Sequence, residues 1–254
     1  MIKKKVLGII PARLESSRLK QKPIIKILGL EMFAHVYFRA KECIDIDEIV
    51  VATDSSIIIN IAKRLNIPSI LTKESHKNPS ERICEVADHM DADIYVLING
   101  DEPLVRPEDI SLSINTLLNS DSDASMLIVP LKKSGSFSDF KVVTDNNENV
   151  MYISRADIPY PYKDNGLGYL KKAYHIMSFY KETIKSYSNL TESRQEIAEQ
   201  HEHIRLIEAG FKIKTKYIEY ECFSVDTQDD LIWVKNKLKY DKFFEKYKNK
   251  IGDI

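Results

Sequence analysis

The chain has 254 residues, of which 43% are hydrophobic and 30% are charged, which is ordinary for a globular protein that buries one substantial core. Its 37 lysines and arginines nearly cancel its 38 aspartates and glutamates, so no global field draws the protein to nucleic acid or to anionic lipid. Any phosphate-binding site must therefore be local.

Membrane and secretion signals are missing from the sequence. No apolar run approaches the roughly 20 residues that a spanning helix needs, and Met1–Lys5 is too short for a signal peptide and leads at once into a strand-like run. The three cysteines are widely spaced and lack the pairing of a disulfide framework or a zinc site. We therefore expect a cytoplasmic protein without membrane insertion.

The first half of the chain alternates short apolar runs with longer segments of helical period, which indicates crossover units and a parallel sheet. The predicted strands are Val6–Ile10, Glu48–Ala52, Ile94–Ile98 and Ser125–Pro130. The predicted helices are Met32–Cys43, Ile57–Leu65, Ser80–Met90 and Glu108–Leu118. The third helix has a start signal, because Asn78 can cap free backbone amides and Pro79 suits the first helical position.

Between about Lys141 and Tyr180 the pattern changes to shorter, aromatic-rich, strand-like stretches, which predict a sheet extension over the core. Helical spacing returns over Gln195–Ala209 and stops at Gly210. A last helix is expected near Thr227, followed by a surface helix in the lysine-rich and tyrosine-rich tail. Without repeats or linkers, we expect one α/β domain over 1–254, with the extension at about 135–185.

A basic turn follows the first predicted strand and carries Arg13, Arg18 and Lys22. In open α/β sheets, ligands bind at the carboxyl ends of the strands. Glycine-rich loops hold phosphate through backbone amides, but this turn has no glycine and would have to neutralise a polyphosphate with its cationic side chains. Taken alone, the segment is better explained as a solvated basic turn.

Two aspartates follow apolar stretches farther along the chain. Asp101 stands beside Gly100 directly after the strand Ile94–Ile98, and Asp226 follows Val225. Such a carboxylate is well placed to hold Mg²⁺ while phosphate supplies other oxygens, although an ordinary turn explains each one alone. Two aspartates combined with the basic turn have the composition of a phosphoryl-transfer or nucleotidyl-transfer site.

In their order and context, these segments resemble the CMP-sugar-acid synthetases, and among them the 3-deoxy-manno-octulosonate (KDO) cytidylyltransferase family. The resemblance extends from about Val6 to Leu231 and is carried by Ile10–Arg13, Ser17–Leu19, Lys22–Pro23, Ala52–Asp54, Ser80–Arg82, Gly100–Pro103, Lys141–Val143, Ser154–Pro159, Glu199, Glu202, Arg205 and Val225–Thr227. It implies a mostly parallel nucleotide-binding sheet flanked by helices, with a smaller sheet that forms a homodimer.

The resemblance also implies a reaction and the residues that bind its substrates and metal ion. CMP from CTP would be coupled to the anomeric hydroxyl of a 2-keto-3-deoxy sugar acid, with release of pyrophosphate. The residues implied for the triphosphate are Arg13 and Lys22, those for Mg²⁺ are Asp101 and Asp226, and Ser80 and Arg82 would lie near the nucleotide. The residues implied for the sugar are Arg82, Asn99, Arg155, His175, Glu202 and His203.

One further group comes from the resemblance. Glu199, Glu202 and Arg205 would share one helical face because residues three and four apart are neighbours on a helix. Without the resemblance, a solvent-facing, salt-bridged helix would be the better explanation for these three residues.

Departures from the family pattern lie mostly on the sugar side. Asn99 and His203 each stand where the family has glutamine, and His175 either replaces a family histidine after a two-residue shift or is structural. A shortened amide or an exchanged hydrogen-bonding group changes substrate preference. We therefore predict a modified KDO, such as one with an amine for a hydroxyl, with neutral drift as the alternative. His35, His76 and His89 have no partner pattern, so core or surface positions are expected for them.

Two other functions stay open. The same fold could activate a sialic-type sugar or a phosphonate, or it could bind nucleotide without turnover. The presence of both Asp101 and Asp226 argues against a binding module, because such a module has no need for two metal carboxylates.

Overall fold

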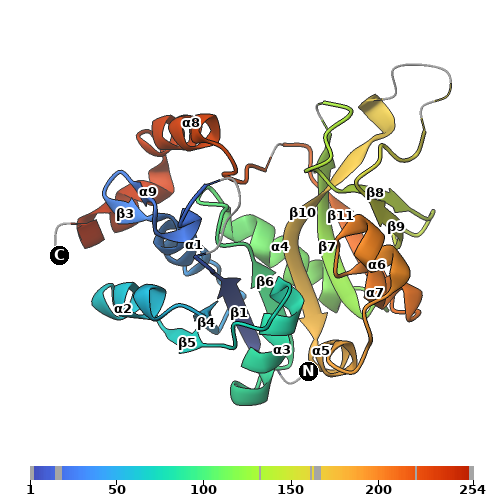
Figure 1. Ribbon diagram of the computed structural model, residues 1–254, viewed down its shortest axis with the longest axis horizontal. Helices are drawn as coiled ribbons and strands as arrows, with labels where there is room; N and C mark the ends of the chain where they lie inside the picture. Colours follow the sequence, from blue (N-terminus) through green and yellow to red (C-terminus); the bar gives the residue numbers. More distant parts are fainter. Residues whose placement is uncertain are drawn as a thin grey trace. The chain divides into compact units, whose positions relative to one another are not determined.

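An apolar strand, β1 (Val6–Pro11), lies inside a parallel sheet in the first of the two units into which the chain divides (Figure 1). This unit comprises Met1–Ser111 and Cys222–Ile254, and the second comprises Leu112–Glu221. The structure is a computed structural model and describes residues 3–14, 19–131, 133–160, 162, 167–220 and 222–251.

The sheet of the first unit is parallel. β1 pairs with β6 (Ile94–Ile98) on one side and with β4 (Glu48–Thr53) on the other, and β4 pairs with β5 (Ser69–Leu71). The strands β1 and β6 are buried almost throughout, as in parallel sheets covered on both faces. The four predicted helices are also present, as α1 (Met32–Ala40), α2 (Ser56–Arg64), α3 (Pro79–His89) and α4 (Pro107–Leu118).

Two helices begin where capping side chains are found. The Oδ1 atom of Asn78 accepts a hydrogen bond from the Glu81 backbone N–H at 2.9 Å, which starts α3. The Oγ1 atom of Thr227 accepts one from the Asp230 N–H at 3.2 Å, which starts α8 (Gln228–Leu238). Both predicted caps are confirmed, and the second places Asp226 immediately before the capping residue of α8.

The chain's last helices are part of the first unit, and they do not form the single surface helix that the sequence predicts for the tail. α9 (Lys242–Tyr247) and the short 3-10 helix Lys248–Ile251 follow α8. Tyr247 is buried, and its hydroxyl lies 2.9 Å from Nδ1 of His35, whose Nε2 lies 2.8 Å from the Ile27 carbonyl oxygen. Burial lowers the pKa of His35 to about 4, so this histidine is neutral and structural.

The second unit has a mixed sheet. β7 (Ala124–Pro130) pairs in parallel with β11 (Ile213–Tyr217) and antiparallel with β10 (Lys171–Tyr180). β8 (Lys141–Thr144) pairs antiparallel with β9 (Val150–Ser154) and with β10. The α/β class and the strand-like character of 141–180 are therefore confirmed. The remaining short elements are η1 (Lys22–Ile24), β2 (Lys26–Ile27), β3 (Leu30–Glu31), η2 (Leu167–Tyr169) and α5 (Lys181–Tyr187).

The predicted helix Gln195–Ala209 is two helices, so that prediction was wrong. α6 (Arg194–Glu199) is capped by Gln200, whose φ of 53° is left-handed, and α7 (Ile204–Glu208) begins after a turn. Glu199, Glu202 and Arg205 consequently do not share one helical face. Arg205 instead forms a buried ion pair with Glu196 at 2.6 Å. Gly210 has a φ of 85° just past α7, as predicted.

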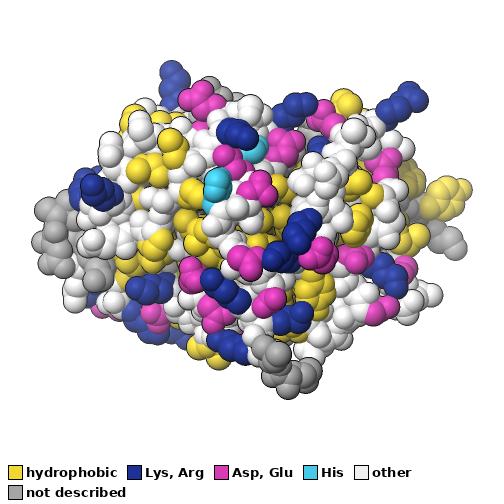
Figure 2. All heavy atoms as spheres, turned by 90° about the horizontal axis from the view of Figure 1, so that it is seen from below, with side chains coloured by type: hydrophobic (Ala, Val, Ile, Leu, Met, Phe, Trp, Pro, Cys, Tyr) yellow, Lys and Arg dark blue, Asp and Glu magenta, His cyan; other side chains and the backbone are white. Residues whose placement is uncertain are grey.

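The surface agrees with the balanced composition. Figure 2 shows cationic and anionic side chains intermingled over the visible face. Across the described residues, every helix is too short or too polar to cross a lipid bilayer.

Candidate active site

A cavity of about 710 Å³ lies in the first unit, where the loops after β1 and β6 come together. The loops can approach because Gly100 has no side chain. A Cβ atom there would lie 2.7 Å from the Pro11 carbonyl oxygen, a distance that backbone atoms do not tolerate. The residues that line the cavity are Pro11, Ala12, Arg13, Lys22, Pro23, His76, Asn78, Pro79, Arg82, Asn99, Gly100, Asp101 and Asp226.

Lys22 lies between the two predicted metal ligands. Its Nζ atom donates to Oδ2 of Asp101 at 2.6 Å, to Oδ1 of Asp226 at 3.0 Å and to the Val225 carbonyl oxygen at 2.9 Å. Burial alone would lower the pKa of Lys22, but the carboxylates of Asp101 and Asp226 outweigh that effect and raise it. A protonated lysine therefore joins residues that are far apart in the sequence.

The backbone holds the two aspartates at this position. The Val225 N–H donates to the Asp101 carbonyl oxygen at 2.9 Å, which ties the segment before α8 to the loop after β6. Both carboxylates are 28% exposed, so each is open to the cavity while it contacts Lys22. Two aspartates from distant segments thus converge on one cation.

The donor set fits Mg²⁺. Among the described residues, Oδ1 of Asp101 is buried and has no hydrogen-bond partner, and a buried carboxylate oxygen without a donor is costly. Mg²⁺ prefers one or two carboxylates together with water and phosphate oxygens. The unpartnered oxygen and the nearby Asp226 carboxylate match that preference.

The other predicted nucleotide residues lie in the same unit with different surroundings. Arg13 is exposed at the cavity, whereas Arg82 is buried on its wall, with Nη2 2.7 Å from Oδ2 of Asp54 and Nη1 donating to the Thr72 hydroxyl. Asn99 also lines the cavity, and Ser80 is buried on α3 without lining it. Ser17 and Arg18 lie outside the described residues.

The remaining predicted sugar residues belong to the second unit. His203 is fully buried, and burial lowers its pKa to about 3, so it is neutral. Its Nε2 atom lies 3.9 Å from Oε1 of Glu202. His175 occupies a register shift of β10 between Tyr174 and Met177, and its side chain lies outside the described residues. The Arg155 guanidinium is 4.2 Å from the centre of the Phe140 ring.

His76 is a residue of the cavity wall that the sequence did not indicate. His76 lines the cavity and contacts Oε2 of Glu85, which also accepts the Lys73 backbone N–H at 2.9 Å. The closeness of His76 to the cap of α3 was the available signal, since Asn78 lines the same cavity.

Comparisons with known proteins identify the family of the chain. Residues 7–215 match the family described as Cytidylyltransferase. The 3-deoxy-manno-octulosonate cytidylyltransferase of Escherichia coli is 34% identical over 230 residues, which are 88% of this chain and 92% of that protein. Its counterpart from Fusobacterium nucleatum is 36% identical over 240 residues, 92% of this chain and 97% of that protein.

A solved structure has the same fold as this chain. The structure of CMP:2-keto-3-deoxy-manno-octonic acid synthetase complexed with CTP superimposes with a TM-score of 0.86 at 31% identity. The alignment covers 93% of this chain and 99% of that one.

The fold and the cavity, with its two aspartates and its cationic side chains, define an enzyme of the nucleotidyltransferase class. Within that class the chain belongs to the 3-deoxy-manno-octulosonate cytidylyltransferase family. The resemblance found in the sequence is thereby confirmed.

Proposed function

We propose that the protein transfers CMP from CTP to the anomeric hydroxyl of KDO and releases pyrophosphate. The observation that carries this proposal is the convergence of Lys22, Asp101 and Asp226 at one cavity, with Arg13 beside it, in a chain of this family. Cations and carboxylates in one cavity are what nucleotidyl transfer requires.

The cationic and the acidic residues of the cavity would have different roles in the reaction. Arg13 and Lys22 would bind the triphosphate and stabilise the negative charge that develops as the sugar hydroxyl attacks the α-phosphorus in line. Asp101 and Asp226 would hold Mg²⁺, which when bound polarises the α-phosphate and offsets charge on the leaving pyrophosphate. Asn99 and the half-buried residues of the wall, among them His76 and Asn78, would position the nucleotide.

The sugar would be recognised by residues of the second unit. Arg155 would bind the carboxylate, because a guanidinium presents two parallel N–H groups to a carboxylate. His175, Glu202 and His203 would contact sugar hydroxyls. His203 is fully buried, so a contact with the sugar would require its ring to become accessible.

A substrate panel tests the proposal. With CTP, Mg²⁺ and KDO we expect stoichiometric pyrophosphate, and with ATP or UTP we expect little. The same panel should include a sialic-type sugar and amine-substituted KDO. A modified acceptor stays a prediction from the sequence, and equal or better use of KDO itself would contradict it. Failure to release pyrophosphate with KDO would contradict the proposed function.

Homodimer formation is a second prediction from the sequence, placed at the extension of about 135–185. Large apolar side chains exposed in this region favour it, namely Phe137, Met151, Tyr160, Tyr162 and Tyr169, because such groups commonly mark interaction surfaces. Light scattering at micromolar concentration should give a mass twice the 29.3 kDa of one chain. A single species of 29.3 kDa would contradict the dimer.

The single-domain organisation and the cytoplasmic location also stay predictions from the sequence.

A further inference from the structure

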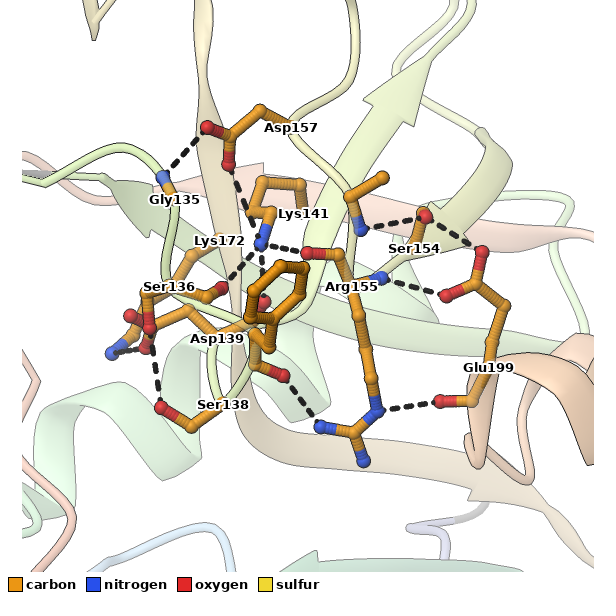
Figure 3. Close-up of polar contacts among 12 residues, drawn as sticks. Gly135, Ser136, Ser138, Asp139, Lys141, Ser154, Arg155, Asp157, Lys172 and Glu199 are labelled. Atoms are coloured by element: carbon orange, nitrogen blue, oxygen red, sulfur yellow. Dashed lines mark hydrogen bonds and ion pairs between the residues drawn. The ribbon is translucent and has the colours of Figure 1, made fainter.

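The Arg155 side chain is held rigidly within the second unit (Figure 3). Its Nε atom donates to the Glu199 carbonyl oxygen at 2.8 Å, and Nη1 donates to the Phe137 carbonyl oxygen at 2.6 Å. The ring of Phe140 stacks against the guanidinium. These contacts fix the plane of the guanidinium before any ligand arrives.

The anchors of Arg155 are backbone carbonyls and a ring, and none of them neutralises its charge. Among the described residues, no carboxylate forms an ion pair with the guanidinium, and Nη2 makes no hydrogen bond. A fixed guanidinium whose Nη2 group makes no hydrogen bond is complementary to an anion, and guanidinium groups suit carboxylates especially well.

Two other charged residues fix the backbone of Arg155. The Glu199 carboxylate accepts the Arg155 backbone N–H at 2.8 Å through Oε2 and the Ser154 hydroxyl at 2.6 Å through Oε1. The Arg155 carbonyl oxygen accepts a hydrogen bond from Nζ of Lys141. The residue is thus held at its N–H, at its C=O and along its side chain.

Lys141 is fully buried, which is costly for an ammonium group unless its hydrogen bonds are made. Besides the Arg155 carbonyl, its Nζ donates to the carbonyl oxygens of Ser136 at 2.6 Å and Asp139 at 2.8 Å, and Asp157 lies at 3.5 Å. The residues 136–140 include the Phe137 carbonyl and the Phe140 ring that hold the guanidinium. Lys141 therefore joins both segments around Arg155.

We propose that Lys141 and Glu199 are positioning residues that preorganise Arg155 for the carboxylate of the acceptor and so set the preference for acidic sugars. This inference rests on the proposed function. Preorganisation lowers the ordering cost of binding. Replacing Lys141 or Glu199 should therefore weaken binding of the sugar acid and leave binding of CTP unaffected.

The variant Glu199→Ala removes both side-chain acceptors, keeps the carbonyl that Nε contacts and suits a helix. We expect KM for KDO to rise about tenfold, as for loss of a hydrogen bond to a charged group, with KM for CTP within about twofold. Glu199→Gln should restore most of the affinity, since the Ser154 hydroxyl can rotate to accept from the amide. Gln195→Ala, at an exposed position of the same helix, is the matched control and should change neither KM.

A double-mutant cycle separates positioning from general loosening. If Glu199 acts through Arg155, Arg155→Ala combined with Glu199→Ala should lose no more affinity for KDO than Arg155→Ala alone. Discrimination between KDO and its C1 amide should fall in Glu199→Ala and in Lys141→Met. If Lys141→Met does not fold, the double-mutant cycle of Glu199 and Arg155 alone tests the positioning role.

Failure of the proposed function and failure of the positioning role give different results. A wild-type protein that releases no pyrophosphate with KDO would refute the proposed function. A wild type that uses KDO, together with a Glu199→Ala variant that has unchanged KM for KDO or that shows additive losses in the cycle, would overturn the positioning role alone.

Discussion

Replacing Asp101 with asparagine should reduce turnover about 1000-fold, because removing a charged ligand of a catalytic cation costs several kcal/mol of transition-state stabilisation. Asparagine has the same shape, and the hydrogen bond that links the Asp101 carbonyl to Val225 is made by the backbone, so the fold should survive. Asp226→Asn should behave similarly, since both carboxylates contact the same ammonium group. Pyrophosphate release at saturating Mg²⁺ measures the effect.

Asp229→Asn is the matched control for these variants. Asp229 is exposed in the first turn of α8, close in sequence to Asp226, and its replacement should leave kcat within about twofold, as for exposed substitutions in general. Calorimetric titration with Mn²⁺ should show weakened binding in the Asp101 and Asp226 variants only. Full activity in either variant would refute the metal assignment.

Replacing Lys22 with methionine should have two opposite effects. Turnover should fall about 1000-fold, because the cation that we propose to bind the triphosphate is lost. The nucleotide-free protein should bind Mn²⁺ about tenfold more tightly, because the ammonium now between Asp101 and Asp226 competes with any divalent ion for the same oxygens. The raised pKa of Lys22 reports the same attraction from the lysine side.

Electron paramagnetic resonance of free Mn²⁺ measures this competition without any turnover. Lys20→Met is the control, because Lys20 is an exposed cation of the same turn and should change neither property. Unchanged or weaker Mn²⁺ binding in Lys22→Met would show that the lysine does not compete with the cation, and unchanged turnover would remove it from the reaction.

Local signals in the sequence sufficed for most of the first unit. The continuous apolar run Ile94–Ile98 is a buried parallel strand because both its faces are covered. Asn78 and Thr227 start helices because each offers an oxygen to free backbone amides. These features depend on neighbouring residues, and so the sequence alone predicts them.

Features set by distant contacts could not be predicted in this way. The left-handed Gln200 breaks a helical pattern that continues through the sequence, and Arg205 pairs with Glu196 instead of lying beside Glu199. His76 carries no motif, and only the folded chain places it at the cavity. The proposed site residues Lys22, Asp101 and Asp226 were each weak as local patterns. Together they had the composition of a phosphoryl-transfer or nucleotidyl-transfer site, and the family resemblance was needed to assign a role to each of them.

The most direct measurement is phosphorus NMR of the wild-type protein with CTP, KDO and Mg²⁺. The proposed reaction predicts that the three resonances of CTP are replaced by one phosphodiester resonance of a CMP-sugar and by pyrophosphate, in equal molar amounts. CTP that persists, or that is hydrolysed to CDP and phosphate without a CMP-sugar resonance, would contradict cytidylyl transfer to KDO.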